Sequence, residues 1–205
     1  MNLYVSCGWF MNTVLRDDRG EPRYRIETCT LLGLKDVETK ITRFLPRTNA
    51  SGSQGQLLVS SVNTRGETHV TARLQEEEIA RIEWHRIMST VFRRPGQNPV
   101  EVDVYMPYTG LFSRKKRAFT ASNGQSYIWK AGSRRSSLLR HDGSRVAVYH
   151  HRSYGILGKA HDPFLEISPE GISIADEIVA TFVYIERRRA QREKSRRGGG
   201  VQATN

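Results

Sequence analysis

The sequence predicts a mainly β fold in which many short strands surround one late helix. The chain of 205 residues carries 17 Gly and 7 Pro between short apolar runs, which is typical of an all-β chain with many turns. Residues 178–185 form the most apolar stretch, and as a helix they are apolar on every side. Such a helix must be surrounded by protein or lipid. A membrane span needs about 20 apolar residues, so this uncharged run is too short to be one.

Alternating apolar residues and turn signals divide the first half of the chain into strands. Leu3 and Val5 alternate with polar neighbours, and residues 9–15 are mostly apolar. The turn Asp17–Gly20 predicts a hairpin that ends in an alternating strand at 24–28. Further short strands are expected at 30–34, 40–45, 57–62 and 79–87, with a flexible loop at 46–56.

The second half of the chain contains the strongest strand and hairpin signals. Val100–Val104 is the cleanest alternation and predicts a half-buried strand. Asn123-Gly124 and Asp142-Gly143 predict tight turns, because both central residues of such turns need positive φ. The paired strands are expected at 117–121 with 126–130 and at 137–140 with 145–150, and a last strand at 164–167. The total is ten to twelve strands.

The late helix is expected over about residues 173–188. Ser173 is the predicted N-cap and Asp176 its acidic partner three residues on. A buried strand is the alternative, since Ile, Val, Thr, Phe and Tyr favour sheets. The predicted core residues of the helix are Ile178, Val179, Phe182, Val183 and Ile185. Residues 1–186 are expected to form one domain, and 187–205 a basic and then glycine-rich tail that is disordered at its end.

A β-rich chain that ends in one apolar helix resembles the tubby C-terminal-like superfold, which includes the phospholipid scramblases and the plant LURP-one-related proteins. The local match runs from Leu165–Pro169 through the helix to Tyr184–Glu186. The whole pattern is also similar to an uncharacterised family of small fungal proteins, a domain of unknown function. Its landmarks here are Met11–Leu15, Ile82–His85, Gly110–Arg114, Tyr127–Lys130 and Thr181–Glu186. The resemblance implies a tubby-like closed β-barrel of roughly twelve antiparallel strands around one buried C-terminal helix. Scrambling activity is not implied, because the proline-rich segment and cysteine cluster of scramblases are missing.

No motif in the sequence predicts catalysis, a cofactor or a metal site. Phosphate-binding, dinucleotide-binding and serine-hydrolase signatures are all missing. The adjacent pair His150-His151 would point to opposite faces of a strand. Cys7 and Cys29 do not form a disulfide framework, which favours a reduced intracellular compartment. The sequence therefore predicts a protein without enzymatic activity.

The net charge of +11 favours anionic partners. Candidate anionic-ligand residues lie in two loops: Arg114, Lys115, Lys116, Arg117, Arg134 and Arg135. Beside them, Leu111 and Phe112 form a candidate membrane-contacting tip, unless Phe112 packs in the core of a solvated hairpin. The basic tail contributes Arg187, Arg188, Arg189, Arg192, Lys194, Arg196 and Arg197.

These features predict a non-enzymatic intracellular domain that binds anionic phospholipid or a partner protein through its basic loops. The alternative is a nucleic-acid-associated protein that acts through its tail, although the tail lacks interleaved aromatic residues for base stacking. The expected location is cytoplasmic, with membrane-peripheral and nuclear positions left open, and no transmembrane span is expected.

Overall fold

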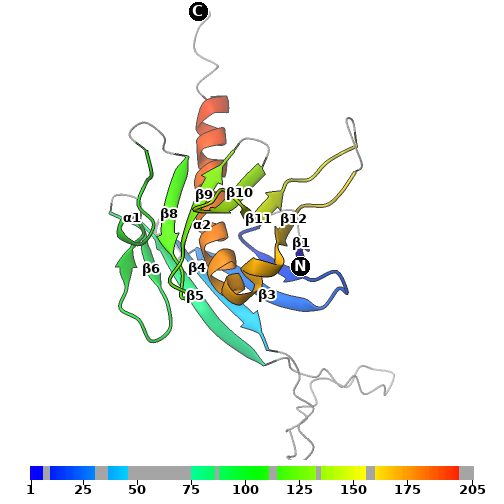
Figure 1. Ribbon diagram of the computed structural model, residues 1–205, viewed down its shortest axis with the longest axis horizontal. Coiled ribbons are helices and arrows are strands. Elements are labelled where there is room, and N and C mark those ends of the chain that lie inside the picture. The colour runs from blue at the N-terminus through cyan, green and yellow to red at the C-terminus, as the bar shows by residue number, and fades with distance from the viewer. Residues whose placement is uncertain are drawn as a thin grey trace, which may run out of the picture.

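The computed structural model describes residues 1–6, 10–30, 37–45, 75–85, 88–110, 115–132, 135–155 and 160–198. In this part of the chain, twelve strands form one antiparallel sheet in the order β7-β6-β5-β4-β3-β2-β1-β12-β11-β10-β9-β8 (Figure 1). The strands are β1 (Asn2–Val5), β2 (Thr13–Arg16), β3 (Pro22–Thr30), β4 (Val37–Phe44), β5 (Glu76–Trp84), β6 (Val91–Arg93), β7 (Val100–Glu101), β8 (Lys116–Thr120), β9 (Ser126–Ala131), β10 (Arg135–Arg140), β11 (Arg145–His150) and β12 (Phe164–Ile167). The predicted strand at 57–62, most of the one at 30–34 and the loop at 46–56 lie outside the described residues.

The sheet curves around a long C-terminal helix, α2 (Ala175–Gly198), which follows the 3-10 helix η1 (Pro169–Ile174). Every residue from 178 to 186 is buried, which confirms the prediction of a surrounded helix. Strands from both halves of the sheet contact it. Trp84 of β5 stacks on Tyr184, and the Trp129 indole of β9 donates a 2.9 Å hydrogen bond to the Thr181 hydroxyl.

The sheet does not close into a barrel, so the closed-barrel prediction is not met. β7 and β8 are the two ends of the strand order, and no described residues pair them with each other. The gap is occupied by the short helix α1 (Val102–Tyr105) and an isolated bridge between Tyr108 and Arg117. β8 is therefore covered by the 107–109 segment, whose backbone bonds to Lys116 and Ala118.

The prediction of a half-buried strand at Val100–Val104 is wrong beyond Glu101. The chain turns into α1, where the Met106 N–H donates to the Val102 carbonyl at 2.7 Å. Val102 and Met106, four residues apart, are both buried, whereas Val104 is 70% exposed. This burial follows the spacing of a helical turn, and the apolar alternation of the sequence resembles a strand only by coincidence.

The two predicted hairpins are confirmed, with Gly124 and Gly143 at φ of 74° and 86° in their turns. The start of the long helix differs from the prediction. Ser173 lies inside η1, and the helical backbone begins at Pro169. Asp176 accepts hydrogen bonds from the Tyr24 hydroxyl and Arg43, and so ties the helix to β3 and β4.

The long helix also ends later than predicted. α2 continues to Gly198, ten residues past the expected end at 188, so most of the predicted tail is helical. Among the described residues, no helix is long and apolar enough to cross a membrane.

Candidate anionic-ligand surface at the basic end of the sheet

The direction of α2 decides where its basic half lies. Near its start, Glu177 accepts hydrogen bonds from the backbone and side chain of Ser122, in the β8–β9 turn. Near residue 186, the Glu186 carboxylate accepts a hydrogen bond from Ser136, at the start of β10. The helix therefore leaves the sheet where β8 begins, β9 ends and β10 begins, and its last turns project there (Figure 1).

Exposed cations gather at this end of the molecule, which we call the basic end. It consists of Lys115, Lys116, Lys130 and Arg135 on the strand ends and Arg188, Lys194 and Arg196 on α2. Lys116 is paired opposite Lys130, and the Ala131 N–H donates to the Lys115 carbonyl at 2.9 Å. Three residues predicted for the ligand surface, Lys115, Lys116 and Arg135, thus lie at this end of the molecule.

Among the described residues, the cations of the basic end have no carboxylate partners. None of the seven forms an ion pair with any residue that the structure describes. Like charges directly opposite each other on neighbouring strands are destabilising, so the Lys116–Lys130 pair is unfavourable by itself. A bound anion would offset this repulsion.

The other half of the sheet has the opposite electrostatic character. Along β3 to β6 nearly every cation faces an acid in an ion pair: Arg25 with Glu76, Lys40 with Glu78, Arg81 with Glu38 and Glu78, and Arg93 with Glu83. Within the described part of the chain, positive charge is therefore compensated on one half of the sheet and left uncompensated at the basic end. This contrast is the main reason to place a ligand site there.

Arg117 does not belong to the ligand surface, which corrects its assignment from the sequence. Its side chain is 4% exposed, and it donates 2.6 Å and 2.7 Å hydrogen bonds to the Met106 carbonyl and the Asp103 carboxylate. The guanidinium also lies 3.7 Å from the Tyr108 ring centroid and 5.1 Å from that of Tyr184. Arg117 therefore joins β8 to α1 and α2 across the gap in the sheet.

Several other predicted residues do not contribute to the surface. Arg187 lies 4.0 Å over the Trp84 ring, and burial lowers the pKa of its guanidinium to about 10. Arg189 is held between Glu186 and Glu193. Arg192 is half-buried, and burial lowers its pKa. The predicted residues outside the described part are Leu111, Phe112, Arg114, Arg134 and the side chain of Arg197.

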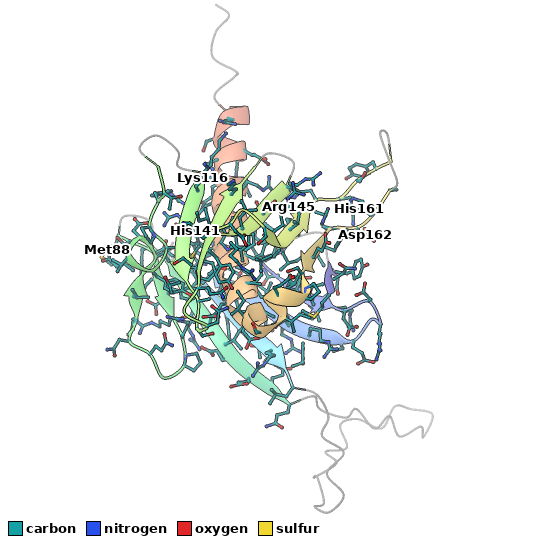
Figure 2. All side chains as sticks on the ribbon, viewed as in Figure 1. Met88, Lys116, His141, Arg145, His161 and Asp162 are labelled. Atoms are coloured by element: carbon teal, nitrogen blue, oxygen red, sulfur yellow. The ribbon has the colours of Figure 1, made fainter. Side chains whose placement is uncertain are left out.

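Two exposed cations of the hairpin strands, Lys130 and Arg145, are missing from the site residues predicted from the sequence. The signal was present, because side chains alternate along a strand. Trp129 is apolar and faces the core, so its neighbour Lys130 lies on the other face of β9. Figure 2 labels Arg145 at the start of β11 and Lys116 on β8.

A buried polar cluster lies where α2 leaves the sheet. Fully buried Glu186 accepts hydrogen bonds from Ser136 and Arg189, and His151 Nε2 lies 3.8 Å from its carboxylate. Burial raises the pKa of Glu186. Burial and the nearby Arg189 guanidinium lower the pKa of His151 to about 4. Tyr149, His150 and Glu193 complete its surroundings. No group of three His, Cys, Asp or Glu in the described part is placed to hold a metal ion.

Stability should fall as the pH drops from about 6.5 to 4, because His151 must gain a proton that its folded environment disfavours. The slope is at most about 1.4 kcal/mol per pH unit. Urea unfolding of wild type and H151Q at pH 7, 5.5 and 4.5 measures this change in stability with pH. H151Q should lose less stability than wild type, whereas H141Q, at an exposed histidine, should behave as wild type. Equal slopes of stability against pH for wild type and H151Q would contradict the assignment of this pH dependence to His151.

The model of a family of unknown function (DUF6593) matches residues 10–191. Neither the curated proteins nor the solved structures contain a match to this chain. The family match includes most of the curved sheet, the described strand cations of the basic end and the buried part of α2. The chain therefore belongs to this family of unknown function, DUF6593.

Proposed function

We propose that this chain is a non-enzymatic domain that binds the anionic surface of a phospholipid membrane through its basic end. The observation that carries the proposal is the convergence of seven exposed cations without carboxylate partners in the described part. Each contributes about 1 kcal/mol near an anionic bilayer, or roughly 7 kcal/mol together. This corresponds to a dissociation constant on the order of 10 μM.

The shape of the molecule agrees with this proposal. A sheet of twelve strands around a buried helix supports the tubby-like resemblance. The proposal includes this resemblance and a position of the domain at the cytoplasmic face of a membrane. Because α2 projects beyond the strand ends, its exposed cations and those of β8 to β10 lie at the same end of the molecule.

A membrane surface fits this end better than a nucleic acid does. Binding of single strands without sequence preference relies on aromatic side chains on which bases stack. Trp84 is buried against Arg187 and Tyr184, Trp129 is fully buried, and one face of Tyr108 is covered by Arg117. These rings therefore serve the packing of α2 and the gap in the sheet.

Co-sedimentation with vesicles that contain phosphatidylglycerol tests the proposal over a salt series. The double variant K115Q/K116Q should bind roughly thirtyfold more weakly than wild type, since two cations contribute about 2 kcal/mol. The control K40Q/R93Q removes the same charge from the compensated half and should bind as wild type. Failure of wild type to bind at low salt would refute the proposal, as would equal losses in the two variants.

A further inference from the structure

A groove on the outer face of β9, β10 and β11 offers a more selective site than the basic end as a whole. Its volume is about 330 Å³. The side chains and glycines that matter for its chemistry are Lys130, Gly132, Arg135, Ser137, Gly143 and Arg145. We call it the strand groove.

The strand pairing places the three cations around one hydroxyl. Lys130 lies directly opposite Ser137, and Arg135 precedes Ser137 by two residues on β10. Arg145 lies opposite Leu139, two residues beyond Ser137. All three cations are exposed, and none is paired with an acid among the described residues. The groove thus presents three positive charges and one hydroxyl toward solvent.

Two glycines set the ends of the groove. The Gly132 N–H donates to the Arg135 carbonyl at 3.0 Å, and a Cβ at residue 132 would lie 2.7 Å from that same oxygen. Any larger residue would therefore push the start of β10 away. Gly143, at a φ of 86°, makes the turn that leads into Arg145. The position of Arg135 thus depends on a close backbone approach that a Cβ would block, and that of Arg145 on a positive φ that glycine adopts readily.

We propose that the strand groove binds a phosphomonoester group. Such a group carries about 1.5 to 2 negative charges at neutral pH and three strong acceptor oxygens. The planar guanidinium matches phosphate oxygens in pairs, and a lysine adds a compact charge. A phosphodiester, with one charge and fewer free oxygens, uses this set of donors less completely.

The inference deepens the proposed function, because the groove shares Lys130 and Arg135 with the basic end and adds Arg145, and it rests on that function for a lipid source of the group. The phosphomonoester can also come from a small soluble molecule. Vesicles with phosphatidic acid present it on a membrane, and glycerol 3-phosphate presents it in solution. Vesicles with phosphatidylglycerol, matched in surface charge, supply the phosphodiester for comparison.

Wild type should bind phosphatidic acid vesicles roughly tenfold more tightly than charge-matched phosphatidylglycerol vesicles. R145Q should remove this preference while leaving binding to phosphatidylglycerol almost unchanged, because Arg145 lies outside the basic end. S137A should reduce the preference by a smaller factor. The control R93Q removes one exposed positive charge elsewhere and should keep the full preference. Thermal melts of each variant establish that the fold is retained.

The outcomes separate this inference from the proposed function. Equal binding to both vesicle types, or an unchanged preference in R145Q, overturns the strand groove while membrane binding stands. Chemical-shift changes at Ser137 and Gly143 on addition of glycerol 3-phosphate, without binding to phosphatidylglycerol vesicles, support the groove and refute membrane binding. Weak binding of glycerol 3-phosphate beside tight binding of phosphatidic acid supports a lipid source, and the reverse supports a soluble one.

Discussion

Replacing Phe182 with alanine is expected to lower the free energy of unfolding by about 4 kcal/mol. Phe182 is fully buried in the first half of α2, and its ring centroid lies 4.7 Å from that of Tyr149 and 6.2 Å from that of Phe10. Truncation removes these contacts and leaves a cavity that the curved sheet cannot fill without moving. The loss is a large fraction of the 5–15 kcal/mol that stabilises an ordinary domain.

Urea unfolding measured by circular dichroism tests this expectation. The matched control is Q191A on the exposed, projecting part of the same helix, which should change stability by less than about 0.5 kcal/mol. F182L keeps most of the volume and should fall between the two. If F182A lost less than about 1 kcal/mol, the helix could not be the element around which the core is built.

The sequence was most informative where one local rule decides the structure. Residues 178–185 carry no charge on any side of a helix, and so their burial followed from composition alone. Gly124 and Gly143 adopt the positive φ that their turns require, which fixed both hairpins. For the candidate site, the hairpin at Gly124 brings Lys116 beside Lys130, at the end of the sheet where Arg135 begins β10.

What the sequence could not predict depends on contacts between distant segments. The alternation at Val100–Val104 fits a strand, and only the packing of Val102 and Met106 turns it into a helix. Whether β7 pairs with β8 depends on the geometry of the whole sheet, which no local sequence pattern specifies. Salt-bridge partners such as Arg81 and Glu38 are 43 positions apart, so the contrast between compensated and uncompensated charge appeared only in the structure.

Arg117 was assigned to the ligand surface because it ends a run of four cations, although strand alternation argued otherwise. Phe119, two residues on, faces the core, so Arg117 has to face inward as well. Replacing Arg117 with alanine should therefore destabilise the fold by roughly 3 kcal/mol, a cost typical of breaking a buried hydrogen-bonded charge. The Met106 carbonyl would lose its donor, and the rings of Tyr108 and Tyr184 would lose the cation between them.

The neighbouring Lys116 gives a sharp control for this prediction. It lies one residue away, is exposed and forms no ion pair with the described residues, so K116A should change the free energy of unfolding by less than about 0.5 kcal/mol. In vesicle binding the order should reverse. K116A should weaken binding, because it removes an accessible charge, whereas R117K should bind as wild type, because it keeps the charge and leaves the surface intact. R117K should still lose stability, since an ammonium cannot reproduce the planar guanidinium between two rings. A stable R117A that binds vesicles poorly would instead place Arg117 at the surface and return it to the ligand site.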